Sequence, residues 1–271
     1  MDQYQDTLSE LNKTATLSEK LRFTHTVLKN RYDFIDRIAV AIYDPKTDLL
    51  KTFIHSSSGD HPLIHYQAIL SEAGSLQEIL HTSNPRVVND LAVFDKGQHE
   101  HTKRIAAQGY GSSYTMPMYL SGTFFGFIFF NSYHKNCFQS EVLHYLDLFG
   151  HLISLVIIND LTTIRTMLAT VKAVRDIANY RDMETGAHLD RVSHYSRLIA
   201  QELAKKYNLS DEFIEHIFLF SPLHDVGKLG LPDAILKKPG KLSGEEFEIM
   251  KSHAQKGRQI IDAILQDFGL D

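Results

Sequence analysis

The sequence predicts an α+β N-terminal domain, an antiparallel sheet with flanking helices, joined by a long helix to an all-α C-terminal domain. Three observations lead to this fold class. Residues 112–132 contain two apolar, β-rich runs on either side of a short turn. From Leu146 to Ile177 apolar side chains recur every three or four positions, without proline or glycine after Gly150. From about residue 170 nearly the whole chain keeps this spacing, and its 271 residues suit two domains.

The N-terminal elements alternate between helical and strand patterns. Residues 1–35 carry an apolar stripe at helical spacing. Two short β-branched runs, Arg37–Tyr43 and Leu49–His55, flank the turn-rich sequence DPKTD and predict a hairpin. A helical segment, Ser75–His81, precedes a short strand in residues 84–91 that opens with a proline. This order of elements is typical of an α+β domain.

The C-terminal region contains a helix that leads into an imidazole and a carboxylate. An apolar stripe over residues 213–220 runs into His224 and Asp225, and Gly227 marks the predicted end of that helix. A loop rich in glycine and proline follows. Ser243, with a glutamate three residues later, predicts a capping box at the start of the last helix.

Composition and charge exclude several classes of protein. The formal net charge is −5, whereas a surface for non-specific nucleic-acid binding requires a basic excess. The N-terminus shows no signal-peptide pattern, and the single cysteine, Cys137, cannot form an internal disulfide. The most apolar stretches, residues 124–130 and 148–158, are shorter than the ~20 residues that span a membrane. We therefore expect a cytoplasmic protein with no membrane span and no nucleic-acid partner.

The long helical pattern predicts a connecting helix over residues 140–180 that overlaps both domains. Its apolar residues shift by one position near Ile157 and then continue, as they do in supercoiled helices. One interpretation is an amphipathic helix packed against its own domains. We prefer a parallel coiled coil in a homodimer, because a long apolar seam between domains otherwise lacks a partner.

Histidines and carboxylates in the C-terminal domain suggest a metal site. Glu184 and His188 are four residues apart and would share one helix face, and His253 lies on the apolar face of the last helix. With His224 and Asp225 they form a set that suits Fe, Mn or Zn, and the lack of cysteine argues against structural zinc. Each histidine alone could be an ordinary core residue. The combination favours a metal site.

Asp225 and Lys228 are the candidate catalytic residues. A dinuclear site would let a bridging hydroxide attack phosphorus while both ions hold the phosphate oxygens. Lys228 would then neutralise the charge that develops on the phosphate. The alternative for Lys228 is a solvated lysine at a helix end, where its charge favours the helix dipole.

The N-terminal region resembles the GAF family of ligand-sensing domains. The similarity is carried by GSLQEILHTSNPRVVNDL and by residues 109–158, with Pro117 and Gly126 in the strand-turn-strand and an F-x-x-E start to the last helix. It extends over about residues 15–158 and implies a GAF-like sensor domain at 1–158 with a pocket for a small molecule. The ligand is unknown, since only a fragment of the pattern of cyclic-nucleotide-binding members is present.

The C-terminal region, residues 170–271, contains three motifs in order: ETGAHLDRV, HDVGKLGLPDAILKKPGKL and EEFEIMKSHAQKG. They resemble the HD-GYP family, a subgroup of HD-domain phosphohydrolases that degrade the bacterial second messenger cyclic di-GMP. The resemblance implies two or three divalent metal ions, with Fe or Mn favoured and Zn as the alternative. By position it implies a lysine that contacts phosphate, Lys228, and the metal ligands Glu184, His188, His224, Asp225 and His253.

The chain also departs from that family. Members continue to a second pair of histidines, the Gly-Tyr-Pro loop and a further metal-ligating aspartate, whereas this sequence stops at Asp271. We therefore expect that it holds the N-terminal part of an HD-GYP-type domain, truncated, binding metal poorly and inactive alone.

The leading hypothesis is a sensor-regulated, metal-dependent phosphodiesterase that hydrolyses cyclic di-GMP. One alternative is a non-catalytic sensor or interaction protein with a degenerate HD domain. Another is an HD hydrolase that acts on a different nucleotide. The metal content of the protein discriminates between the enzyme and the first alternative, because the enzyme requires bound transition metal and the non-catalytic protein does not.

Overall fold

A computed structural model of the chain describes residues 6–59, 63–94, 108–178 and 186–268. The chain divides into two compact units. The first comprises the residues up to Asn159 together with Ser210–Glu212, and the second comprises the remaining residues.

The first unit is built on a six-stranded antiparallel sheet with the strand order β3-β2-β1-β6-β5-β4. The strands are β1 (Arg37–Asp44), β2 (Leu49–Ser57), β3 (Gln67–Ile69), β4 (Arg86–Val88), β5 (Ser112–Leu120) and β6 (Thr123–Ser132). The predicted antiparallel sheet is thereby confirmed. The sequence pattern did not indicate β3, because three residues are too few to show alternation.

The central hairpin owes its tight turn to two residues in the left-handed region. Leu120 pairs with Thr123, so Ser121 and Gly122 alone connect β5 to β6. Their φ angles are 49° and 81°. Positive φ at both positions is typical of a type I′ turn, whose twist matches that of the flanking strands, and glycine adopts it without steric cost.

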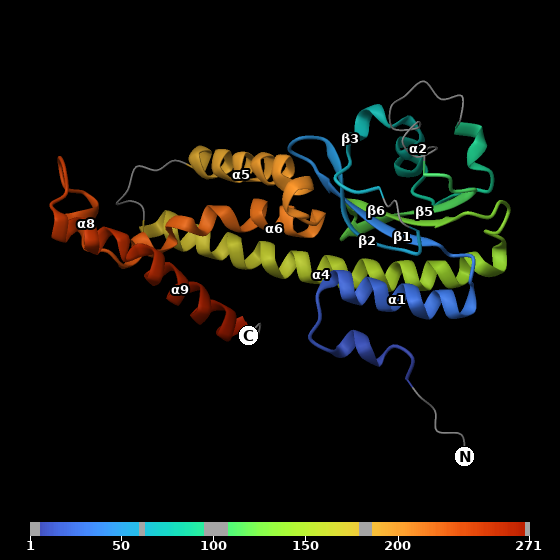
Figure 1. The fold of residues 1–271 in the computed structure, drawn as a ribbon, viewed down its shortest axis with the longest axis horizontal. Helices are drawn as coiled ribbons and strands as arrows, with labels where there is room; N and C mark the ends of the chain where they lie inside the picture. The colour runs from blue at the N-terminus through green and yellow to red at the C-terminus, as the bar shows by residue number, and fades with distance from the viewer. Residues whose placement is uncertain (1–5, 60–62, 95–107, 179–185, 269–271) are drawn as a thin grey trace, which may run out of the picture. The chain divides into compact units, whose positions relative to one another are not determined.

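Helices cover both faces of this sheet (Figure 1). They are α1 (Leu17–Arg31), α2 (Gly74–Thr82) and the first part of α4 (Ser140–Ala178), with 3₁₀ turns η1 (Ser9–Asn12), η2 (Leu70–Glu72) and η3 (Leu91–Phe94). A capping box starts α1, with Thr16 accepting from the backbone of Glu19. Among the described residues 6–35, the N-terminal helical pattern thus forms the short η1 and the regular helix α1 instead of one continuous helix.

The two faces of the sheet differ in chemistry. The face toward α1 and α4 is apolar, and Gly150 of α4 lies so close to it that an added Cβ would be 2.4 Å from Met116 Sδ. On the face toward α2, apolar side chains such as Leu76 and Phe127 form a smaller cluster. That second face also carries buried polar residues, among them Arg37 and Asn131.

The predicted long helix is present as α4, with 39 residues from Ser140 to Ala178. Among the described residues, one stretch, Ser140–Ala173, is long and apolar enough to cross a membrane, with a mean hydropathy of 1.5. This is weak evidence for a span, because core helices of soluble proteins pass the same test and 39% of the window is buried here.

All regular secondary structure in the described residues of the second unit is helical, including the last part of α4. Its other helices are α5 (Gly186–Tyr207), α6 (Asp211–Phe220), η5 (Ser221–Gly230), α7 (Asp233–Leu236), α8 (Gly244–Lys251) and α9 (His253–Phe268). The predicted all-α domain is confirmed. The predicted capping box is present as well, because Ser243 accepts from the backbone of Glu246 and Glu246 bonds back to the backbone of Ser243.

One helix boundary differs from the prediction. The helix expected to end at Gly227 stops at Phe220, and a 3₁₀ helix, η5, continues to Gly230. Pro222 lies in the first turn of η5, where its missing N–H needs no partner. The imidazole of His224 and the carboxylate of Asp225 are therefore presented from a 3₁₀ helix.

Candidate metal centre

Three elements of the second unit bring the predicted site residues together. η5 carries His224, Asp225 and Lys228, α9 begins with His253, and α5 carries His188. The ring centroids of His188 and His224 are 6.3 Å apart. Glu184, the remaining predicted ligand, lies outside the described residues.

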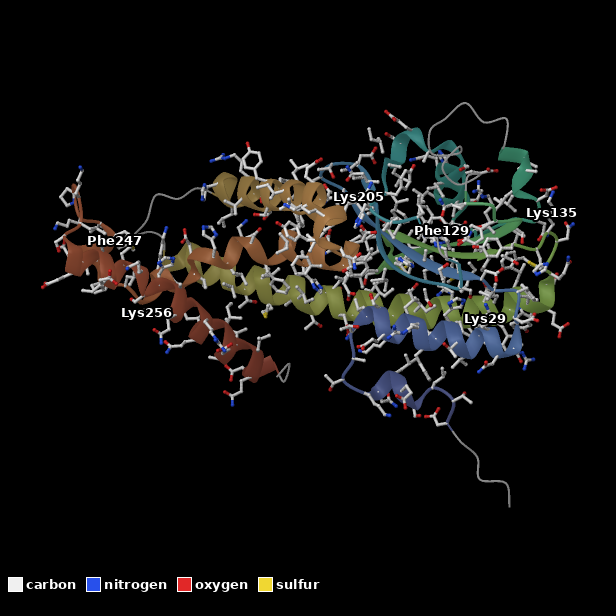
Figure 2. The ribbon with its side chains drawn as sticks, viewed as in Figure 1. Lys29, Phe129, Lys135, Lys205, Phe247 and Lys256 are labelled. Carbon is white, nitrogen blue, oxygen red and sulfur yellow. The ribbon has the colours of Figure 1, made fainter. Side chains whose placement is uncertain are left out.

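A glycine allows η5 and α9 to approach at backbone distance. A Cβ on Gly227 would lie 1.8 Å from the carbonyl oxygen of His253 and 2.4 Å from the amide nitrogen of Gly257. Lys256 of α9, labelled in Figure 2, donates from Nζ to the carbonyl of Gly230. This close packing places His253 beside Asp225.

The carboxylate of Asp225 is the centre of the cluster. Its Oδ2 lies 2.7 Å from Lys228 Nζ and 3.1 Å from His224 Nε2, and its Oδ1 lies 3.6 Å from His253 Nε2. The side chain is 12% exposed. Burial raises the pKa of Asp225, but the hydrogen bond and charge of Lys228, with smaller effects of the two histidines, lower it below its ordinary value.

Both imidazoles are oriented by backbone carbonyls. His224 Nδ1 lies 2.9 Å from the carbonyl oxygen of Ser221, and His253 Nδ1 lies 2.8 Å from that of Met250. A carbonyl oxygen only accepts, so each Nδ1 carries a proton and donates. Each Nε2 consequently faces Asp225.

This arrangement fits a bound cation. With the proton on Nδ1, the Nε2 of a neutral imidazole offers a lone pair beside the Asp225 carboxylate, and a cation between them would satisfy both acceptors. Histidines that donate Nδ1–H to a carbonyl and offer Nε2 are a common form of metal ligand. Among the described residues, however, no group of three or more His, Cys, Asp or Glu side chains is assembled closely enough to hold a metal ion.

Sequence reasoning missed the supporting residues of this site. Gly227 was assigned to a helix end, whereas its role is close contact with α9. The carbonyls of Ser221 and Met250 carry no signal in the side-chain sequence. A glycine that follows a His-Asp pair by two residues was the available hint.

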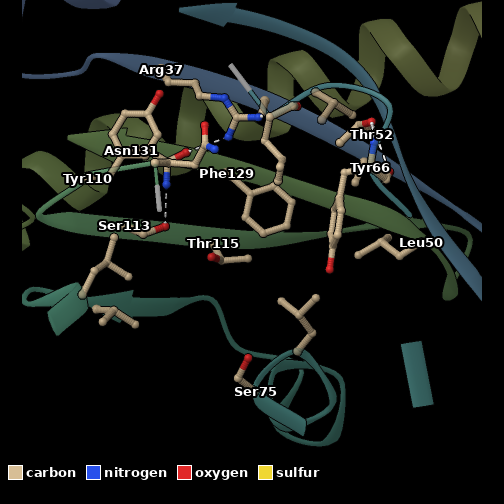
Figure 3. Close-up of a pocket in the computed structure, with 18 of the residues that line it drawn as sticks. Arg37, Leu50, Thr52, Tyr66, Ser75, Tyr110, Ser113, Thr115, Phe129 and Asn131 are labelled. Carbon is tan, nitrogen blue, oxygen red and sulfur yellow. Dashed lines mark hydrogen bonds between the residues drawn. The ribbon is translucent and has the colours of Figure 1, made fainter. Parts of the chain in front are cut away.

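A second candidate site lies in the first unit, between the sheet and α2. A cavity of about 80 Å³ is lined by apolar residues and by buried polar side chains of β1, β5 and β6. Figure 3 shows Arg37, Tyr110 and Asn131 at one end of it and Phe129 and Tyr66 farther along.

Comparison with protein families identifies the class of the second unit. Residues 185–271 match the family model described as HD domain. This confirms the resemblance of that region to HD domains.

Curated relatives match the same region. A probable cyclic di-GMP phosphodiesterase of Vibrio cholerae serotype O1 is 47% identical over 98 residues, which are 35% of this chain and 22% of the relative. A cyclic di-GMP phosphodiesterase of Thermotoga maritima is 48% identical over 85 residues, 31% of this chain and 22% of the relative. A 3'3'-cGAMP-specific phosphodiesterase 2 of V. cholerae is 45% identical over 82 residues, 30% and 15%. The chain thus matches less than a quarter of the length of each.

Solved structures resemble the first unit. The phycocyanobilin-bound GAF domain of a cyanobacterial phytochrome has a TM-score of 0.44 and 15% identity, covering 56% of this chain and 89% of that chain. The GAF domain of an Acinetobacter phosphoenolpyruvate-protein phosphotransferase has a TM-score of 0.43 and 13% identity, covering 56% and 89%.

Proposed function

We propose that the whole protein is a sensor-regulated, metal-dependent phosphodiesterase that hydrolyses cyclic di-GMP. The observation that carries this proposal is the Asp225 carboxylate, which faces Lys228 and two oriented imidazoles. It lies in a region that is 44–48% identical to three phosphodiesterases named for cyclic di-GMP.

Each site residue receives a role. Five residues would hold the metal: Glu184, His188, His224, Asp225 and His253. We propose two or three divalent ions, with Fe or Mn favoured over Zn. When bound, the metal would supply an activated water and positive charge on the phosphate oxygens. Lys228 would bind a phosphate oxygen and neutralise charge in the transition state.

The other parts of the chain would regulate this site. In this proposal residues 1–158 form the sensor domain, residues 140–180 form the signalling helix and residues 170–271 form the HD-type region. Two copies of the chain would associate as a parallel homodimer along α4. A cytoplasmic location agrees with the lone cysteine and with the buried fraction of α4.

Metal content and turnover of the full-length gene product test the proposal. His224→Ala is expected to lose both bound transition metal and hydrolysis of cyclic di-GMP. Lys228→Ala is expected to keep the metal and lose about 10²–10³ in turnover, the effect of removing one group that stabilises the transition state. Lys237→Ala, an exposed lysine on the segment that follows α7, is the control and should change neither.

Other outcomes would redirect the assignment. A full-length protein without transition metal and without hydrolysis would support the non-catalytic sensor instead.

A second substrate is supported by one observation. Relatives named as 3'3'-cGAMP-specific match this region at up to 45% identity, close to the value for those named for cyclic di-GMP. The rates at which one preparation of the full-length protein hydrolyses cyclic di-GMP and 3'3'-cGAMP decide between the two substrates.

A further inference from the structure

The cavity between the sheet and α2 contains a buried guanidinium with an unsatisfied donor. Arg37 is 6% exposed. Its Nη1 donates to Asn131 Oδ1 at 3.1 Å and its Nη2 to the Leu63 carbonyl at 3.4 Å, whereas its buried Nε has no hydrogen-bond partner. Within the described part of the chain, no carboxylate pairs with Arg37.

A second guanidinium reaches the same cavity from β4. Arg86 is half-buried and donates from Nη1 to the Ser75 carbonyl at 2.7 Å. Burial lowers the pKa of both Arg37 and Arg86, because each charge loses hydration, and at Arg86 the charge of Glu78 opposes this effect. None of the 19 described residues that line the cavity is an aspartate or a glutamate.

The remaining wall provides neutral donors and an aromatic surface. Asn131 Nδ2 donates to Ser113 Oγ at 3.0 Å, so this buried polar group continues the row that starts at Arg37 (Figure 3). Thr115 and Phe129 lie across from each other in the strand register and complete the floor. A buried charge is costly unless a partner of opposite charge compensates it.

We propose that this cavity binds a small organic carboxylate, held by Arg37 and Arg86 with its carbon skeleton against Phe129. The planar guanidinium fork matches a carboxylate through paired hydrogen bonds. The apolar wall favours an anion with a carbon skeleton over inorganic phosphate, whose whole surface is polar. This binding site goes beyond the proposed phosphodiesterase activity and can be measured without catalysis.

The volume of the cavity limits the ligand. A cavity of about 150 Å³ in another protein accommodates one benzene molecule, and this one measures about 80 Å³. Benzene has six non-hydrogen atoms, so the ligand for this smaller cavity should have about three or four, as formate and acetate do. A cyclic nucleotide is several times larger.

Calorimetric titration of the 271-residue chain with acetate, pyruvate, inorganic phosphate and cyclic GMP tests the proposal. We expect saturable binding of acetate at one site per chain, and weaker or no binding of the larger pyruvate, of inorganic phosphate and of cyclic GMP. Arg37→Gln and Arg86→Gln should each weaken carboxylate binding at least about tenfold, the usual effect of removing one partner of a buried charge pair. Arg22→Gln, at an exposed position of α1, is the matched control and should bind like the wild type.

Arg37→Gln also removes hydrogen bonds within the sheet, so the circular dichroism and melting temperature of each variant are recorded first. If Arg37→Gln does not fold, the half-buried Arg86→Gln carries the test. The proposal is overturned if no carboxylate binds at millimolar concentration, if phosphate or cyclic GMP binds more tightly, or if carboxylate affinity is unchanged in the folded arginine variants.

Discussion

Gly227 illustrates how one missing side chain positions a site. Because a Cβ there would lie 1.8 Å from a backbone oxygen of α9, Gly227→Ala has to push η5 away from that helix. We expect it to lower the free energy of unfolding by about 2–3 kcal/mol, the usual cost of overpacking a tight contact. Urea unfolding followed by circular dichroism measures the change.

Gly244→Ala is the matched control for this substitution. A Cβ at Gly244, the first residue of α8, meets nothing within 4 Å. This variant should be as stable as the wild type. Equal stability of the two alanine variants would show that the contact between η5 and α9 is looser than described.

His25 makes the first unit sensitive to pH. Its imidazole is buried, with Nε2 donating to the Ile35 carbonyl at 2.9 Å and Nδ1 2.8 Å from Ser56 Oγ. Burial lowers the pKa of His25, although the bond to Ile35 opposes this. The unfolded chain therefore binds the proton more readily than the folded protein.

The sign of the effect follows from this difference. Above the unfolded pKa of about 6.5, His25 is neutral in both states and does not change the free energy of unfolding. As the pH falls from there toward the lowered folded pKa, only the unfolded chain takes up the proton, so the protein loses stability. We expect the free energy of unfolding to fall between about pH 7.5 and about pH 5.5, and His25→Gln to reduce that slope. His151→Gln, at an exposed position of α4, should keep the wild-type slope; an unchanged slope in His25→Gln would refute the prediction.

Capping determines whether the short helices of the second unit form. α8 has eight residues, so few internal hydrogen bonds support it, and its capping box satisfies donors at its first turn. We expect Ser243→Ala to cost about 1 kcal/mol and Ser243→Asp to restore most of it, since aspartate is also a good N-cap. Amide hydrogen exchange in α8 reports the difference, and equal exchange in all three proteins would argue against the cap.

The sequence predicted the elements whose signal is long or chemically specific. The hairpin of β5 and β6, α4 and the capping box of α8 are confirmed, because turn chemistry and apolar spacing act locally. β3 was missed because three residues are too few to show alternation, and the close approach of η5 to α9 at Gly227 is tertiary packing, which a local pattern does not contain.

For the candidate site, the sequence indicated which residue types take part but not how their side chains are oriented. Motif order indicated His188, His224, Asp225, Lys228 and His253, which the structure places on three neighbouring elements of one unit. The carbonyls that orient the imidazoles were invisible, because backbone contacts depend on tertiary packing. Arg37 was overlooked for a related reason: an arginine at the start of a strand is usually solvated, and only the sheet shows that it is buried.

At the scale of the whole molecule, the apolar seam predicted for the coiled coil is buried within the chain itself, because Leu146, Ile153, Ile157 and Leu161 are at most 4% exposed. The proposed homodimer would therefore use another face of α4. In its first half two exposed leucines, Leu148 and Leu155, are 69% and 68% exposed and seven residues apart. A seven-residue apolar repeat is the spacing of a coiled-coil seam. Burying this pair against a second copy would remove apolar surface from water.

Charge on that seam should prevent association. The double variant Leu148→Glu, Leu155→Glu is expected to sediment as a monomer where the wild type sediments as a dimer, because like charges would face each other across the axis. Thr170→Glu adds a charge at an exposed position of α4 outside the two apolar positions of that heptad and should remain dimeric. A monomeric wild type, or a dimeric double variant, would contradict the coiled coil.

The uncompensated charge of Arg37 also bears on how long the protein survives in a cell. A ligand that binds only the folded state lowers the unfolded fraction in proportion to its concentration. Proteases act on that unfolded fraction, so a stabilising ligand slows degradation. If a carboxylate occupies the cavity, its scarcity would shorten the lifetime of the protein, and the amount of protein present would itself follow the supply of that carboxylate.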